Sequence, residues 1–86
     1  RRQREAFLQQ ARLDEARTYL LAGDPASALA TLEDLEASVP VLEIRASAWS
    51  AVGDHGKAAD SLERILEMEP DRRDVQAWLV RERGVR

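Results

Sequence analysis

The sequence predicts an all-α fold of about five helices, arranged as antiparallel helix-turn-helix pairs. Apolar residues recur at helical spacing in every segment that lies between the glycines and prolines. The four Gly and three Pro are few, and they stand where one helix should end and the next begin. No segment alternates apolar and polar residues with a β-branched bias, so no strand is expected.

The first pair of helices is expected over residues 3–22 and 25–37. Gly23 ends the first helix, because glycine reaches the left-handed conformation of a helix C-cap at little cost. Asp24 and Pro25 favour a new helix, since Asp is a good N-cap and Pro fits the first helical position. The residues expected to face inward are Phe7, Ala11, Leu13, Ala16, Leu20, Leu21, Ala28, Leu29, Leu32 and Leu35.

The second pair is expected over residues 40–52 and 56–68, with Asp54 in the connecting turn as N-cap. A fifth helix is expected to follow, capped by Asp71 and ended by Gly84. The residues expected to face inward are Leu42, Ala46, Trp49, Val52, Ala58, Ala59, Leu62, Ile65, Leu66, Val75, Ala77, Trp78 and Leu79.

The two pairs repeat each other at a spacing of thirty residues. In each copy a small Ala lets two helix backbones approach, and an aromatic residue three positions later fills the space between helices. A Gly-Asp step then ends one helix and begins the next. The matching positions are Ala16 and Ala46, Tyr19 and Trp49, Gly23-Asp24 and Gly53-Asp54, Ala28 and Ala58, Leu32-Glu33 and Leu62-Glu63, and Pro40 and Pro70.

This pattern resembles the tetratricopeptide repeat, in which a small residue precedes an aromatic and is followed by Ala-x3-apolar and then Pro. The resemblance covers residues 10–84, with a third start at Ala77-x2-Val80. It implies a tetratricopeptide-like α-solenoid fragment, and an ordinary antiparallel helical bundle is the alternative. The family period is 34 residues, whereas the repeat in this chain has a period of 30. Each unit is therefore four residues shorter than in the family, and we expect those four residues to be missing around positions 39–42.

The whole chain, residues 1–86, is expected to form a single domain of this kind. Residues 1–40 would be the first pair with an extended first helix, 41–70 the second pair, and 71–86 a terminal or capping helix. Because the chain begins at Arg1 rather than Met, we expect it to be a piece of a longer protein.

The composition excludes several classes of function. Without Cys there is neither a disulfide nor a thiolate metal site. No apolar run approaches the roughly 20 residues that span a bilayer, so this segment is not expected to insert into a membrane. The net charge of −3 disfavours nucleic acid as a partner. We expect a cytoplasmic protein, with a periplasmic or membrane-tethered one as the alternatives.

Charge is distributed unevenly along the chain. Residues 1–17 hold five Arg against three acids, residues 18–71 hold three cations against eleven acids, and residues 72–86 hold five Arg against two acids. We interpret these charges as solvated helix ends and exposed faces. Twelve of the thirteen cations are Arg, which is typical of a GC-rich bacterial gene.

No pattern predicts catalysis, so we expect neither an enzyme nor a cofactor, with no catalytic and no metal-binding residues. His55 is the only His; it lacks a second metal ligand and a nucleophile nearby, and we expect a solvated turn residue. The acidic stretches 33–36 and 67–71 are expected to be exposed helix faces. The Gly53-x-x-Gly56 turn lacks the Lys-Ser/Thr step of a phosphate-binding loop.

The resemblance implies a protein–protein interaction module, an adaptor or scaffold that holds a peptide or helix of a partner protein in a concave groove. The first helix of each pair would line that groove. Tyr19 and Trp49 are expected to pack between helices, whereas Trp78 lies on the terminal helix, where a solenoid presents a capping or docking surface. The expected partner-binding residues are Leu13, Arg17, Leu20, Leu21, Glu43, Ser47, Ser50 and Trp78. The Lys/Asn groove pattern that clamps a C-terminal carboxylate in some family members is absent.

The alternative function is self-association, in which this segment is the structural assembly domain of a larger bacterial protein. The long first helix and the helix that carries Trp78 would then dock on a second copy and form a homo-oligomer. In a membrane-anchored version of this protein, Arg1, Arg2 and Arg4 would be the flank of an anchor.

Overall fold

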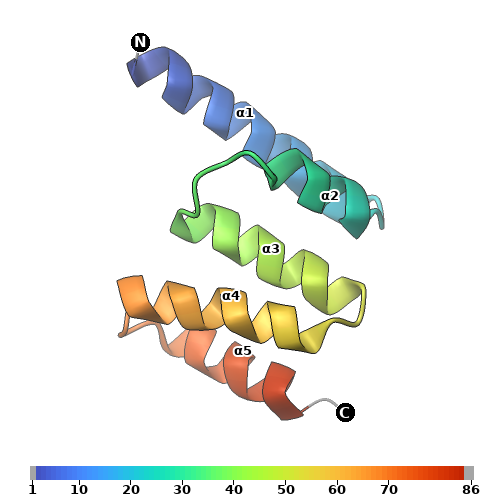
Figure 1. Cartoon of the computed structure of the whole chain (residues 1–86), viewed down its shortest axis with the longest axis vertical. Helices are drawn as coiled ribbons and strands as arrows, with labels where there is room; N and C mark the ends of the chain where they lie inside the picture. Colours follow the sequence, from blue (N-terminus) through green and yellow to red (C-terminus); the bar gives the residue numbers. More distant parts are fainter. Residues whose placement is uncertain (1, 85–86) are drawn as a thin grey trace.

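The computed structural model describes residues 2–84, with side chains from residue 7 onward. Arg1 and the side chains of Arg2 and Arg4 therefore lie outside the described part, as do residues 85–86 of the predicted terminal unit. Over residues 2–84 the chain forms five helices and no strand, which confirms the predicted all-α class (Figure 1). The helices are α1 (Arg2–Leu21), α2 (Pro25–Leu32), α3 (Val39–Ala51), α4 (His55–Met68) and α5 (Arg73–Gly84).

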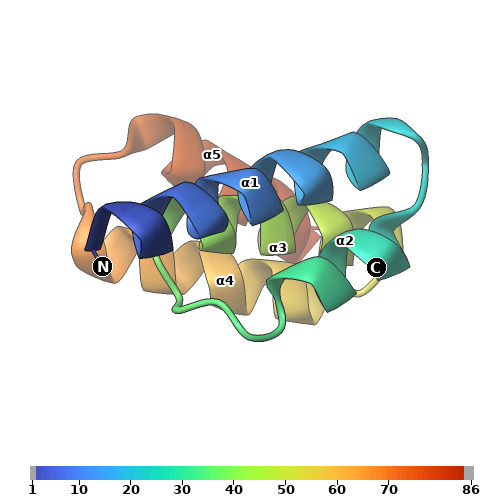
Figure 2. The same ribbon diagram turned by 90° about the horizontal axis from the view of Figure 1, so that it is seen from above.

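The helices are arranged in two layers. Figure 2 shows α1, α3 and α5 in one layer and α2 and α4 in the other. Each helix packs against the one before it in the chain, and α3 also contacts α1. The described structure measures 42 × 29 × 17 Å, and its shortest dimension accommodates two layers of helices whose axes lie about 8–10 Å apart. This arrangement is that of an α-solenoid fragment rather than of a closed bundle.

The core consists of two clusters that meet on α3. The first joins α1, α2 and α3, and the second joins α3, α4 and α5. The central helix therefore buries residues on both sides, which ties the two helix pairs together. The buried members are Leu13, Ala16, Ala28, Leu32, Val41 and Ile44 in the first cluster, and Leu42, Ala46, Ala59, Leu62, Ile65, Val75 and Leu79 in the second.

The turn between α1 and α2 has the hydrogen bonds of a Schellman motif. Gly23 has a φ of 79°, and its N–H donates to the carbonyl of Leu20 at 3.0 Å. The N–H of Asp24 donates to the carbonyl of Tyr19 at 2.8 Å. The carboxylate of Asp24 then caps α2, since its Oδ1 accepts from the N–H of Ser27 at 3.1 Å.

The turn between α3 and α4 repeats the same bonds thirty residues later. Gly53 has a φ of 86°, and its N–H donates to the carbonyl of Ser50 at 3.0 Å. The N–H of Asp54 donates to the carbonyl of Trp49 at 2.9 Å, and its Oδ1 accepts from the N–H of Lys57 at 3.0 Å. The predicted thirty-residue repeat thus extends to individual backbone bonds.

The second helix is shorter than predicted, because α2 ends at Leu32 rather than near residue 37. The matching residues of the second pair, 63–68, are helical, whereas residues 33–38 form a turn and an irregular link. Three acids within residues 33–36 oppose the dipole at a helix C-terminus. The two pairs therefore differ in residues 33–38, and positions 39–42, where the four residues missing from the family period were expected, form the first turn of α3.

The start of α5 also differs from the prediction. The helix begins at Arg73, and no side-chain bond from Asp71 caps it among the described residues. Ala77 is exposed, as is Val80, whose surface is 71% accessible, whereas Ala16 and Ala46 are fully buried. Ala77 therefore does not occupy the buried position that Ala16 and Ala46 share, and the prediction that a third repeat starts there is wrong.

Several residues expected to face inward are exposed. Phe7 is 73% accessible and Leu21 is 90% accessible, and Ala11 and Val52 are exposed as well. For Phe7 and Ala11 the cause is the short α2: its 8 residues span about 12 Å, whereas the 20 residues of α1 span about 30 Å. The first half of α1 therefore extends past the helix that it packs on (Figure 1). Leu21 and Val52 lie instead at the helix ends just before the Gly23 and Gly53 turns.

Candidate functional site

The predicted groove residues of α1 do not share one environment. Leu13 is buried in the first core cluster, so its assignment as a groove contact is wrong. Arg17 is exposed and pairs with Asp14 at 3.2 Å. Leu20 is half-buried against the first cluster, and Leu21 is exposed. Of the groove residues predicted on this helix, Arg17, Leu20 and Leu21 thus remain accessible.

Of the predicted groove residues of α3, Glu43 already has a partner within the chain. The guanidinium of Arg72 donates to Glu43 at 2.9 Å and to Glu69 at 2.7 Å, and it also bonds Asp74. These carboxylates raise the pKa of Arg72, and the Arg72 guanidinium lowers the pKa of Asp74 to about 2. Ser47 is half-buried. The polar end of the predicted groove is therefore partly occupied by the link before α5.

Glu82 is a buried carboxylate on α5 that the sequence did not single out. Nδ1 of His55 lies 2.5 Å from its Oε2, and Nε1 of Trp78 donates to its Oε1 at 3.0 Å. Burial raises the pKa of Glu82, but hydrogen bonds from Ser50, His55 and Trp78 outweigh it and leave the pKa below its ordinary value. Ser50, which was predicted to bind a partner, thus links α3 to α5. Trp78, also predicted to bind a partner, bonds Glu82 within α5 and packs against the second core cluster.

His55 was expected to be a solvated turn residue, and this expectation is wrong. It is the first residue of α4, and its side chain is 28% accessible. Its bond to Glu82 spans 27 residues of sequence and joins α4 to α5. A single histidine paired with one buried carboxylate explains a helix contact and requires no catalytic role.

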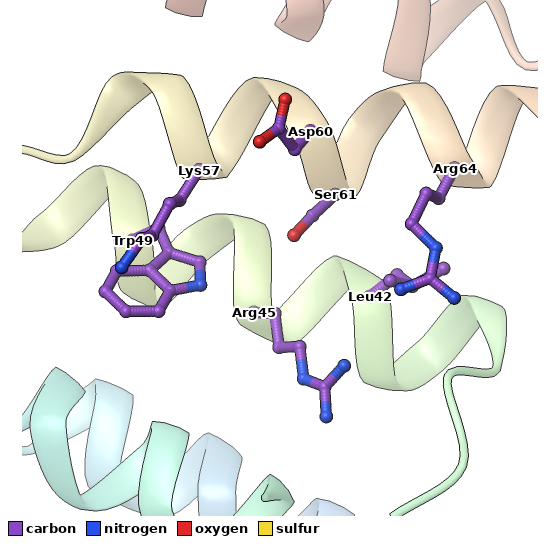
Figure 3. A pocket seen from close by; sticks show the side chains of 7 residues that line it. All are labelled: Leu42, Arg45, Trp49, Lys57, Asp60, Ser61 and Arg64. Atoms are coloured by element: carbon purple, nitrogen blue, oxygen red, sulfur yellow. The ribbon is translucent and has the colours of Figure 1, made fainter.

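The surface is hollowed on the face that carries α2 and α4, over the middle of α3 (Figure 3). A hollow of about 300 Å³ lies between α3 and α4, and one of about 340 Å³ lies between α2 and α3. Arg45 and Trp49 line both, so we treat the two as one site, the Trp49 hollow. Its lining residues are Leu29, Ala30, Glu33, Leu42, Arg45, Trp49, Lys57, Asp60, Ser61 and Arg64.

Two contacts shape the Trp49 hollow. Nη2 of Arg45 donates to the carbonyl of Leu32 at 3.1 Å, which satisfies a free carbonyl at the end of α2 and holds that helix end against α3. Nζ of Lys57 lies 4.3 Å from the centroid of the Trp49 ring, a cation–π contact visible in Figure 3. The expectation that Trp49 packs in the core is therefore wrong, because its half-buried ring forms part of a surface wall.

One spacing pattern in the sequence indicates this site. Arg45 and Trp49 are four residues apart on α3, and Lys57, Asp60 and Arg64 follow at spacings of three and four on α4. Residues at such spacings lie on one face of a helix. The short α2, which leaves these two faces uncovered, could not be foreseen from that pattern.

Within the residues searched, no cluster of His, Asp or Glu is arranged to hold a metal ion. None of the described helices combines the length and the apolar character needed to span a bilayer. Two surfaces of the described residues could contact another molecule: the exposed apolar positions of α1 and the Trp49 hollow.

The fold and these surfaces define a helical-repeat domain. A family model for the tetratricopeptide repeat matches residues 9–34, which comprise the second half of α1, the Gly23 turn and α2. The chain thus carries a tetratricopeptide-like repeat, as its spacing predicted, and repeats of this family are typically non-catalytic modules for protein–protein interaction. Searches of curated proteins and of solved structures gave no match.

Proposed function

We propose that this domain is a protein–protein interaction module whose partner docks a peptide or a helix in the Trp49 hollow. The observation that carries the proposal is the position of Trp49, a large aromatic ring in the wall shared by two adjoining hollows. Aromatic residues in concave sites dominate the energy of many protein interfaces. In this fold the ring is presented by the central helix, which is anchored on both sides.

The shape of the site favours a peptide over an enclosed small molecule. Each hollow, at about 300 and 340 Å³, is at the lower limit of ligand pockets, which hold roughly 300–1,000 Å³. The walls are the helices α2 and α4, and the rim consists of long charged side chains. A partner helix or extended segment can lie between two such walls and place single side chains against the ring.

The groove formed by the layer of α1 and α3 is the competing surface. Arg17, Leu20, Leu21 and Ser47 remain available there, although Glu43 and Ser50 bond within the chain. If this groove is the site, replacing Arg17 and Leu20 together should abolish partner capture while helicity is kept. The two surfaces lie on different layers of the domain, so substitutions can separate them.

Peptides selected from an unbiased display library on the wild-type chain provide the test. Their affinity should fall at least about tenfold on Ala30→Trp, because the new ring would fill the hollow beside Trp49 from an exposed position of α2. Ala77→Trp, at an exposed position of α5, is the matched control and should bind as the wild type does. Arg17→Ala/Leu20→Ala should also leave binding unchanged.

Two results would contradict the proposal. If Arg17→Ala/Leu20→Ala loses binding and Ala30→Trp does not, the partner uses the other layer. If the library yields no peptide that distinguishes Ala30→Trp from Ala77→Trp, the Trp49 hollow is not a docking site. Circular dichroism of each variant ensures that a lost affinity does not reflect a lost fold.

Self-association is a second candidate, favoured by the uncovered half of α1. Phe7 is 73% accessible and Leu8 is 55% accessible, on a helix that extends past α2. Two adjacent apolar side chains of this size can form the centre of a contact with a second copy. Light scattering at several concentrations should then show a dimer that Phe7→Ser/Leu8→Ser converts to a monomer. A wild-type chain that remains monomeric at high micromolar concentration would exclude this function.

A further inference from the structure

The cations of the acidic middle of the chain are gathered at one place. Residues 18–71 contain three cations against eleven acids, and the three are Arg45, Lys57 and Arg64. All three line the hollow between α3 and α4, together with a single acid, Asp60. If these three cations served only as solvated charges, they would not be expected to line the same hollow. Glu33 is the one other acid of the Trp49 hollow and lies on its α2 side, so the three cations exceed the two acids and the hollow is locally positive in an acidic stretch of the chain.

We infer that the segment bound in the Trp49 hollow is an acidic peptide of a partner protein. This inference rests on the proposed function, since it names the chemistry of what docks there. Asp or Glu side chains of the peptide would contact Lys57 and Arg64, and an apolar side chain next to the acid that contacts Lys57 would lie against the Trp49 ring, which Figure 3 shows at the Lys57 end of the hollow. Charge-assisted hydrogen bonds to carboxylates are stronger than neutral ones, and they select the sign of the partner.

The three cations retain donors for such contacts. Arg45 uses Nη2 on the carbonyl of Leu32, but a guanidinium carries five N–H donors. Nζ of Lys57 lies above the Trp49 ring and 3.9 Å from Asp54, so its pairing with that carboxylate is loose. Arg64 is exposed on α4. A carboxylate that approaches the ring would therefore meet donors from both α3 and α4.

The geometry also restricts the spacing of acids in the peptide. Lys57 and Arg64 are seven residues apart on one face of α4, which places them about 10 Å apart along the helix axis. That distance corresponds to three residues of an extended chain or to seven residues of a helix. Asp60, between the two cations, disfavours a third acid midway and favours a neutral residue there.

A short acidic segment fits better than a nucleic acid or an anionic membrane surface. The net charge of the chain is −3, and residues 18–71 contain eleven acids against the three cations of the hollow. An extended polyanion would meet those acids over most of its contact area, whereas a peptide of a few residues meets only the hollow. The hollow therefore distinguishes acidic from other peptides through direct contacts with its cations rather than through long-range attraction.

The test uses short synthetic peptides rich in Glu and Leu, with two matched sets in which every Glu is replaced by Gln or by Lys. The wild-type chain should bind the Glu peptides at least about tenfold more tightly than the Gln peptides, which corresponds to about 1.4 kcal/mol. The Lys peptides should bind more weakly still. Fluorescence anisotropy of labelled peptides measures each affinity.

A charge-reversed variant makes the assignment specific. Lys57→Glu/Arg64→Glu should prefer the Lys peptides, because the hollow has exchanged its sign. Arg73→Glu/Arg81→Glu changes the net charge by the same amount at exposed positions of α5, outside the hollow, and should keep the preference for Glu. If both variants change preference alike, net charge decides binding and the inference is overturned.

The remaining outcomes separate this inference from the function on which it rests. If Glu, Gln and Lys peptides bind the wild type equally, and Ala30→Trp weakens all of them, the hollow is a docking site without preference for acids. The proposed function then stands and the inference falls. If no peptide of any charge responds to Ala30→Trp, the docking site itself is wrong, and both fall.

Discussion

Leu62→Ala should destabilise the domain strongly, because Leu62 is fully buried in the cluster that joins α3, α4 and α5. The change removes apolar volume worth about 0.8 kcal/mol for each buried CH₂ and leaves a cavity between three helices. A loss of about 2–5 kcal/mol is therefore expected. Against a total stability of about 5–15 kcal/mol, such a loss could unfold part of the population at room temperature.

Urea unfolding followed by circular dichroism measures this loss. With a slope of about 1–3 kcal/mol per molar urea, a loss of about 3 kcal/mol moves the midpoint by about 1 M or more. Leu32→Ala should behave alike, because Leu32 occupies the matching position of the first pair and is also fully buried. Leu21→Ala, at a residue that is 90% accessible, is the control and should cost less than about 0.5 kcal/mol. A comparably small cost for Leu62→Ala would refute the register of the repeat.

Three further substitutions test local features. Gly53→Ala should cost about 1–2 kcal/mol in urea unfolding because of its φ of 86°, whereas Gly56→Ala in α4 should be neutral or stabilising by up to about 1 kcal/mol. Asp54→Ala should cost about 0.5–2 kcal/mol through the lost N-cap of α4, and Asp54→Ser should restore most of it; equal stability of the two variants would exclude the cap. Because the pKa of Glu82 is lowered in the folded state, its ionised form stabilises the fold above the unfolded pKa of about 4.3, and this contribution disappears as pH falls through the folded value. Glu82→Gln should therefore be less stable than the wild type at neutral pH, and the difference should shrink toward pH 3; a gap independent of pH would contradict the assignment.

Features that depend on neighbouring residues could be predicted from the sequence. The Gly23 and Gly53 turns, with the Asp caps that follow each, form where the residue types favour them, since every bond in them spans five residues or fewer. The all-α class and the thirty-residue repeat follow from the same short-range signals. Buried positions on α4 were also predicted correctly, because helical spacing alone defines that face. On the central helix Leu42 and Ala46 are buried as predicted, whereas Trp49 is half-buried and Val52 is exposed.

Features decided by distant residues could not be predicted. The end of α2 depends on a bond from Arg45, thirteen residues away, and the burial of Glu82 depends on His55, twenty-seven residues away. The exposure of Phe7 follows from how far α2 extends rather than from the pattern of α1. The predicted groove lay on the layer of α1 and α3, whereas the Trp49 hollow lies on the opposite face, which the short α2 leaves uncovered.

The central claim, that a partner segment binds on the Trp49 ring, can be tested by one NMR titration. The chain has two Trp residues, and the indole N–H of each gives its own signal. Trp49 lies in the hollow, whereas the indole of Trp78 donates to Glu82. Addition of a Glu/Leu peptide should shift the Trp49 signal and leave the Trp78 signal in place. A shift confined to Trp78, or no shift of Trp49 at saturating peptide, would contradict the claim.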